Sequence, residues 1–186
     1  MKRSLTLSIL FFVFLIFSFF TSKVYAQEIA ARSSAVLISK GNIKAPDSRT
    51  EILKSYLKQY DSPLVSYAQS FVDTADKYNL DWRLVVAISG VESTFGQRIP
   101  YDSYNGWGWG IYGDHMIRFS SWNEGIETVS EGLRNKYINK WGAQDIYAIG
   151  RFYAASPTWA QRVVYFMNSI EQFQNTKSAT KLALAL

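Results

Sequence analysis

Apolar residues recur at intervals of three and four positions in successive segments of this chain. Because residues at that spacing lie on one face of an α-helix, the pattern predicts amphipathic helices that each bury one stripe. It predicts long helices over residues 48–60, 63–78, 81–95, 121–137 and 157–173, and a short helix over 145–153. We find no convincing ladder of strands and no internal repeat.

Helix-start signals precede most of these segments. Ser with Glu three residues later is typical of a capping box, in which the side chain of each residue accepts a hydrogen bond from the backbone N–H of the other. This pattern occurs at Ser48 and Glu51 and again at Ser121 and Glu124. Ser followed by Pro suits the cap and first position of a helix, and it occurs at 62–63 and 156–157. Asp81 is the predicted cap of the third helix.

The helical pattern disappears over residues 96–120, where Gly, Asn, Asp, Pro and aromatic residues dominate. Long irregular segments inside a compact domain are often functional. The sequence therefore predicts a mainly α fold, with one helical domain over 47–175 and a long irregular loop or small lobe within it. We expect an extended lead-in over 27–46 and a frayed tail over 176–186.

The first 26 residues have the pattern of a secretory signal peptide. Lys2 and Arg3 precede an apolar run over residues 5–20, and the small residues Val24 and Ala26 precede a cleavage position before Gln27. An uncleaved anchor is the alternative, but the run is shorter than the roughly 20 residues that span a bilayer. We therefore expect a secreted or cell-envelope protein that has no membrane segment after cleavage.

Composition excludes several classes of function. The chain has 20 Lys and Arg against 15 Asp and Glu, but without the predicted signal the balance is only 17 against 15. With no long basic run, nucleic acid is not an expected partner. The absence of Cys and the single His exclude disulfides, Cys-ligated metals and multi-histidine metal sites. We expect no metal and no cofactor, and we expect a monomer.

Glu92 is the most informative residue of the third predicted helix. At about 100° per residue it projects near the centre of the apolar stripe formed by Leu84, Val85, Ile88, Val91 and Phe95. Burial disfavours the carboxylate anion, so the pKa of Glu92 should be raised. A carboxylic acid that keeps its proton near neutral pH suits general-acid catalysis. The alternative is a structural Glu that caps a helix or pairs with Arg98 or Arg118.

Three segments in order resemble motifs of the lysozyme-like superfamily. Glu92-Ser93-Thr94-Phe95-Gly96 is similar to the "Glu-Ser-x-x-Gly" signature of soluble lytic transglycosylases and family 73 glucosaminidases. The stretch from Asn105 to Ile111 resembles the "Asn-x-x-Gly-Ile" loop of the glucosaminidases, and residues 152–163 resemble their "Tyr-Ala-Thr-Asp-Pro-x-Tyr-Ala-x-Lys-Val" segment. The resemblance covers residues 81–166 and implies a lysozyme-like helical domain whose loop lines a glycan groove.

The resemblance also implies roles for individual residues. Glu92 would be the catalytic acid and Tyr153 the active-site tyrosine that faces it, while Asn105 and Gly110 would shape the floor of the groove. The rings of Tyr104, Trp107 and Trp109 are candidates to lie against sugar faces, or alternatively to form an aromatic core under the loop. Ser156 stands where the family motif has Asp, and this departure leaves the bond specificity open.

The expected partner is the glycan strand of bacterial peptidoglycan. Glycosidases usually employ two carboxylates, and the candidates for the second are Asp102 and Asp114. Without a second carboxylate, the substrate's own N-acetyl group or the 6-hydroxyl of N-acetylmuramic acid can attack the anomeric carbon. The first route gives a glucosaminidase, our first choice, and the second a lytic transglycosylase. A wall-binding module without catalysis is the third hypothesis.

Overall fold

The computed structural model of this chain describes residues 47–110 and 115–184, except for the side chain of Lys181. The chain divides into two units, Met1–Ala45 and Pro46–Leu186, and only the second contains described residues. The predicted signal peptide, its cleavage site and the lead-in over 27–46 lie outside the described residues.

The described part of the chain is helical, and the predicted mainly α fold class is confirmed. No strand occurs among the described residues. The helices, in chain order, are α2 (Ser48–Lys58), the 3-10 helix η1 (Pro63–Tyr67), α3 (Ala68–Lys77), α4 (Leu84–Ser93), α5 (Trp122–Gly132), the π-helix η2 (Leu133–Lys140), α6 (Ile146–Tyr153) and α7 (Trp159–Ala183).

Two of the five predicted helix caps, Ser62 and Ser121, have the expected side-chain bond. The predicted caps at Asp81 and Ser156 are wrong, because α4 begins after Arg83 and α7 after Thr158, and neither start has a side-chain cap. Ser62 accepts a hydrogen bond from the N–H of Leu64, Ser121 caps α5, and Asp145 caps α6. The cap of α2 is Asp47, one residue before the predicted Ser48, because the Asp47 carboxylate accepts from the N–H of Arg49. A carboxylate at this position also interacts favourably with the positive end of the helix dipole.

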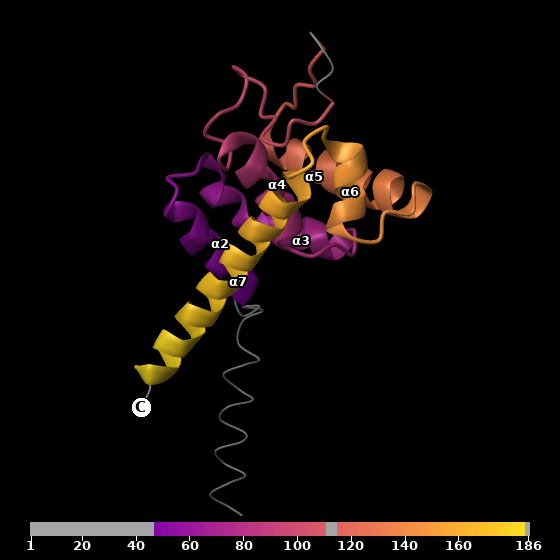
Figure 1. The fold of residues 1–186 in the computed structure, drawn as a ribbon. Helices are drawn as coiled ribbons and strands as arrows, with labels where there is room; N and C mark the ends of the chain where they lie inside the picture. Colours follow the sequence, from indigo (N-terminus) through magenta and orange to yellow (C-terminus); the bar gives the residue numbers. More distant parts are fainter. Residues whose placement is uncertain (1–46, 111–114, 185–186) are drawn as a thin grey trace, which may run out of the picture. The chain divides into compact units, whose positions relative to one another are not determined.

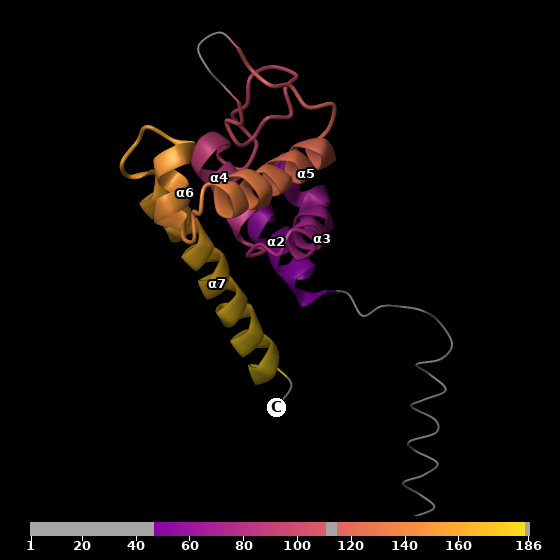
Figure 2. The same ribbon diagram turned by 90° about the vertical axis from the view of Figure 1, so that its right-hand side faces the viewer.

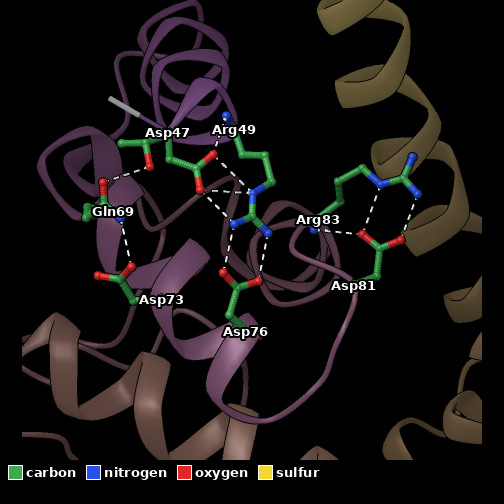
Figure 3. A network of polar contacts seen from close by, with 8 residues as sticks. Asp47, Arg49, Gln69, Asp73, Asp76, Asp81 and Arg83 are labelled. Atoms are coloured by element: carbon green, nitrogen blue, oxygen red, sulfur yellow. Dashed lines mark hydrogen bonds and ion pairs between the residues drawn. The ribbon is translucent and has the colours of Figure 1, made fainter. Parts of the chain in front are cut away.

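Charged side chains connect the first two α-helices (Figure 3). Arg49 on α2 forms ion pairs of 2.6 Å with Asp47 and of 2.7 Å with Asp76 on α3. Its planar guanidinium binds both carboxylates at once, a geometry that Lys could not reproduce. The network orients α2 against α3, and it lies among groups that are partly open to solvent, so its contribution to stability is small.

The helix α4 forms the centre of the domain. It packs against α3, α5 and α7, and α7 also packs against α2 and α6. Figures 1 and 2 both show the loop that follows α4 at the end of the domain where α7 begins. That end therefore brings together the last turn of α4, the loop and the first turns of α7.

The chain leaves α4 through three successive residues with positive φ. Thr94, Phe95 and Gly96 have φ angles of 54°, 56° and 83°. A β-branched residue such as Thr94 rarely adopts this conformation, so surrounding contacts must hold it. The buried Ser93 hydroxyl accepts from the N–H of Gly96 and lies 2.7 Å from the carbonyl oxygen of Gly106, to which it donates. These bonds connect the end of α4 to the loop.

Two helices extend differently from the prediction. The helix α7 continues to Ala183. The expectation of a frayed tail is therefore wrong for residues 176–183. Side-chain hydroxyls of Thr176 and Thr180 bond to carbonyls one turn earlier and are compatible with the continued helix. The π-helix η2 continues α5 directly, a feature that spacing of apolar residues does not reveal. None of the described helices is both long and apolar enough to cross a membrane.

Candidate active site

Glu92 lies in the last turn of α4, where the helix leaves the core. Residues 84–90 of α4 are buried, whereas the Glu92 side chain is exposed. The expectation that Glu92 occupies the centre of a buried stripe is therefore wrong. Because α4 is surrounded by other helices, it buries its whole circumference and not one stripe, and only its last turn reaches the surface.

Each oxygen of the Glu92 carboxylate faces a different part of the fold. The indole N–H of Trp159, at the start of α7, donates to Oε1 over 2.6 Å. The other oxygen faces the loop, since a β-carbon added at Gly108 would lie 3.1 Å from Oε2. Among the described residues Glu92 forms no ion pair with Arg98 or Arg118, so that structural alternative has no support.

Burial raises the pKa of Glu92 above its ordinary value, as predicted. Water reaches the exposed side of the carboxyl, while the indole of Trp159 and the backbone of Gly108 exclude it from the other side. The hydrogen bond from Trp159 and the positive charge of Arg162 stabilise the anion and offset part of the increase. The carboxyl therefore keeps its proton to a higher pH than a free Glu does.

Tyr153, the last residue of α6, lies beside this carboxyl. Its ring stacks on Trp159 with centroids 4.6 Å apart, and its hydroxyl donates to the carbonyl oxygen of Trp107 over 2.7 Å. Burial raises the pKa of Tyr153 well above its ordinary value, and the neighbouring Glu92 carboxylate adds to the effect. Tyr153 is therefore a neutral phenol whose oxygen has a fixed position.

Asn105 organises the loop from inside. Its side chain is 2% exposed, and its Nδ2 donates to the carbonyl oxygens of Trp109 and Ile117 over 2.8 and 2.9 Å. Its Oδ1 accepts from the N–H of Trp109 over 3.0 Å. Asn105 therefore shapes the loop through its amide, and it lies under the surface that a ligand would touch.

Trp107 belongs to the core. Its side chain is 0% exposed, and its Nε1 donates to the carbonyl oxygen of Val85 on α4. The ring packs against Phe71, Phe119 and Trp122. The expectation that Trp107 stacks on a sugar is wrong, because the loop folds back on α4 and buries this ring. Its backbone carbonyl still serves the site, since it accepts the hydrogen bond from Tyr153.

Trp109 and Gly110 line a cavity of about 200 Å³ next to Glu92. The other lining residues are Gly108, Ile117, Lys136, Tyr137 and Tyr153. Gly108 and Gly110 have φ angles of 61° and 65°, which favour glycine, and a β-carbon at Gly110 would clash with Ile117 at 2.3 Å. The cavity lies between the loop, η2 and the end of α6, and Gly108 connects it to the Glu92 carboxylate.

The remaining predicted site residues lie apart from this cavity. Tyr104 is half-buried and its ring packs edge-on against Trp122, so it is a support of the loop. Asp102 is exposed, with φ of 52°, and its carbonyl accepts from Arg118. Asp114 lies outside the described residues. No described residue that lines the cavity is a second carboxylate, and no group of three potential metal ligands occurs in the described part of the chain.

Solved structures of autolysin E have a similar arrangement of helices. A catalytic mutant of S. aureus autolysin E in complex with the disaccharide NAG-NAM matches with a TM-score of 0.56 and 17% identity, covering 67% of this chain and 67% of that chain. Autolysin E in complex with the muropeptide NAM-L-Ala-D-iGlu matches with a TM-score of 0.54 and 18% identity, over the same shares. No protein-family model and no curated protein sequence matches this chain.

This chain has the fold of autolysin E. The predicted lysozyme-like, glucosaminidase-type fold is therefore confirmed. At this level of identity the comparison concerns the fold alone. The assignment of individual site residues rests on the geometry given above.

A larger cavity of about 490 Å³ lies elsewhere, between α6 and the segment that leads into α7. It is lined by Tyr147, Arg151 and Pro157 among others, and it does not include Glu92. Gly150, another of its lining residues, lies against the edge of the Trp159 indole away from Nε1. We assign the candidate active site to the smaller cavity, because only that cavity adjoins a carboxyl with a raised pKa.

The sequence did not indicate three contributors to the site. Trp159 lies within the predicted helix over 157–173, where a Trp on an apolar stripe suggests a core residue, and it is 1% exposed, but its N–H points at Glu92. Tyr137 ends the predicted helix over 121–137, where it continues an apolar stripe, and no local pattern marks Lys136. A buried indole usually has a hydrogen-bond partner, so each Trp on a helix stripe was a signal that a polar group lies nearby.

Proposed function

We propose that this protein is an endo-β-N-acetylglucosaminidase that cleaves the β-1,4 glycan backbone of bacterial peptidoglycan. The observation that carries the proposal is the Glu92 carboxyl, whose raised pKa keeps it protonated to higher pH. Gly108 lies beside this carboxyl and also lines the cavity, together with Trp109, Tyr137 and Tyr153. The shared fold supports it, since autolysin E has been crystallised with NAG-NAM and with a muropeptide.

In the proposed reaction Glu92 donates its proton to the bridging glycosidic oxygen as the bond from that oxygen to the anomeric carbon breaks. The N-acetyl oxygen of the same sugar attacks the anomeric carbon and forms an oxazolinium ion. Water then adds to this carbon and gives its proton to the Glu92 carboxylate, which restores the acid. This route is consistent with a cavity whose described lining contains no second carboxylate.

Tyr153 is the proposed positioning partner of the reacting sugar. Its hydroxyl proton is donated to the Trp107 carbonyl, so its oxygen can accept a hydrogen bond from the substrate. Because the phenol is neutral, this oxygen can orient the N-acetyl N–H or a sugar hydroxyl beside the developing positive charge. The stack on Trp159 holds the ring in place.

Product analysis tests the proposal. The chain over 27–186 is incubated with isolated cell wall, and the products are measured by mass spectrometry. Reducing N-acetylglucosamine ends support the glucosaminidase. Anhydro-muramic ends indicate a lytic transglycosylase in its place, and binding without products indicates a wall-binding module.

The variant Glu92→Gln tests the catalytic acid, because it keeps the size of the side chain and removes the proton. We expect turnover to fall by at least about 100-fold, the contribution typical of a general acid. Glu131→Gln, at an exposed Glu on α5, is the matched control and should keep wild-type activity. Wild-type turnover by a folded Glu92→Gln variant contradicts the assignment.

The proposal includes export from the cell, on the basis of the signal-like residues 1–26. N-terminal sequencing of protein recovered from the medium of cells that express the full chain tests this part. A mature protein that begins at Gln27 supports secretion with cleavage. Recovery of the intact chain in the membrane fraction indicates a retained anchor.

A further inference from the structure

A continuous row of aromatic rings runs from the Glu92 carboxyl to the surface. Trp159 stacks on Tyr153, and the Tyr153 ring lies 5.8 Å from that of Tyr137. Tyr137 in turn lies 4.9 Å from Trp141 and 6.5 Å from Phe152. Tyr153 and Tyr137 line the cavity, whereas Trp141 and Phe152 are not among its lining residues.

The two outer rings are exposed although they contact each other. Trp141 is 38% exposed and Phe152 is 50% exposed, with ring centroids 5.1 Å apart. They come from different segments, since Trp141 directly follows η2 and Phe152 lies on α6, which packs against η2. Large exposed apolar side chains that gather next to a cleft commonly mark a binding surface.

Lys136 connects this surface to the cavity. It is one of the residues that line the cavity, and its Nζ lies 4.8 Å from the centroid of the Trp141 ring. An ammonium group at this place can donate to the hydroxyls of a ligand that leaves the cavity over Tyr137. The aromatic faces and this donor together suit a ligand with apolar faces and hydroxyl edges, which is the chemistry of a pyranose ring.

We propose that Trp141 and Phe152 form an outer subsite that binds a further sugar ring of the glycan strand. This inference rests on the proposed function, because it takes the occupant of the cavity to be that same strand. The continuity through Tyr137 and Lys136 argues for the strand and not for an unrelated protein partner. The subsite makes the protein prefer long glycan strands over short fragments.

Binding to glycan fragments of two lengths tests the subsite. The Glu92→Gln protein, which does not consume its ligand, is titrated calorimetrically with the NAG-NAM disaccharide and with an octasaccharide of the same repeat. In that background Trp141→Ala should weaken octasaccharide binding about tenfold, which corresponds to about 1.4 kcal/mol of lost stacking. Disaccharide binding should change less, because its two rings are expected over Tyr153 and Tyr137, before the strand reaches Trp141.

Two further variants make the result specific. Trp141→Phe keeps a ring and should retain most of the octasaccharide affinity. Tyr165→Ala removes an equally prominent ring on α7, 66% exposed, and should change neither affinity. A thermal melt of each variant shows that it is folded. Equal affinities of Trp141→Ala and its parent for the octasaccharide, or an equal loss for both lengths, overturn the subsite.

The experiment separates the two proposals. If the wild type releases products while Trp141→Ala binds the octasaccharide like its parent, the hydrolase stands and the subsite fails. If octasaccharide binding depends on Trp141 while no products form, the subsite stands and the hydrolase fails. If neither fragment binds, the subsite is overturned as well.

Discussion

Replacing Gly132 with Ala should destabilise the protein when Trp109 is present and stabilise it when the Trp109 indole is removed. Gly132 lies between α5 and η2 with helical backbone angles, φ of −62° and ψ of −44°. In such a position Ala is favoured over Gly by about 1 kcal/mol. However, the added β-carbon would lie 2.4 Å from Cζ2 of the Trp109 indole, and no real β-carbon comes that close.

The clash outweighs the helix propensity because the indole has little room to move. Its ring contacts Tyr137 and Tyr153 at centroid distances of 5.7 and 5.8 Å. Overpacking of this kind costs about 1–3 kcal/mol, so Gly132→Ala should destabilise the protein by up to about 2 kcal/mol. The strained indole would also press on Tyr137 and Tyr153, which line the cavity, and so weaken ligand binding.

A double-mutant cycle measures the clash directly. Trp109→Leu removes the distal ring that lies over Gly132, and in that background Gly132→Ala should stabilise the protein by up to about 1 kcal/mol. Unfolding in urea, followed by circular dichroism, gives the four free energies of unfolding. If Gly132→Ala changes the free energy of unfolding equally in both backgrounds, the two residues are not coupled and the reasoning is refuted.

Three other substitutions test the site. Trp159→Phe removes the N–H that stabilises the Glu92 anion, so the pKa of Glu92 should rise and the alkaline limb of kcat/KM against pH should move to higher pH; an unchanged or lower limb contradicts the hydrogen bond. Gly108→Ala should lower the free energy of unfolding, measured in urea, by about 1–2 kcal/mol because its φ is positive, and a neutral effect would show that the loop relaxes. Asn105→Ala leaves buried backbone groups unpaired and should cost about 2–3 kcal/mol in the same measurement, whereas a loss of binding without a loss of stability would give Asn105 a direct contact with the ligand.

The helices and their caps follow from local sequence patterns. Ser62 and Ser121 were predictable because a helix start needs an acceptor for its free N–H groups, and the chain supplies one at the right position. The cap of α2 was displaced by one residue because both Asp47 and Ser48 can serve, and only the contact with Arg49 decides between them. The end of α7 was missed because its last turns bury little, so the apolar pattern stops before the helix does.

The candidate acid was predictable, but the reason for its environment was not. The motif at Glu92 identified the residue, and the stripe argument predicted the direction of its pKa shift. The stripe itself was misleading, since α4 is buried on all sides and Glu92 emerges at its end. The pKa of Glu92 is raised because Trp159 and Gly108 shield part of the carboxyl from water. Both residues are distant from Glu92 in the sequence, so a local pattern does not reveal their contact with it.

The sequence by itself determined where most helices form and which residue is the candidate acid, because both depend on neighbours within one or two turns. Only the tertiary structure decided which loop rings face a ligand. Trp107 and Trp109 are separated by one glycine, yet the first is buried under the loop and the second lines the cavity. The positions of the two indoles differ because Asn105 fixes the turn between them, and only Trp107 bonds to the backbone of α4. These contacts join segments that are distant in the sequence.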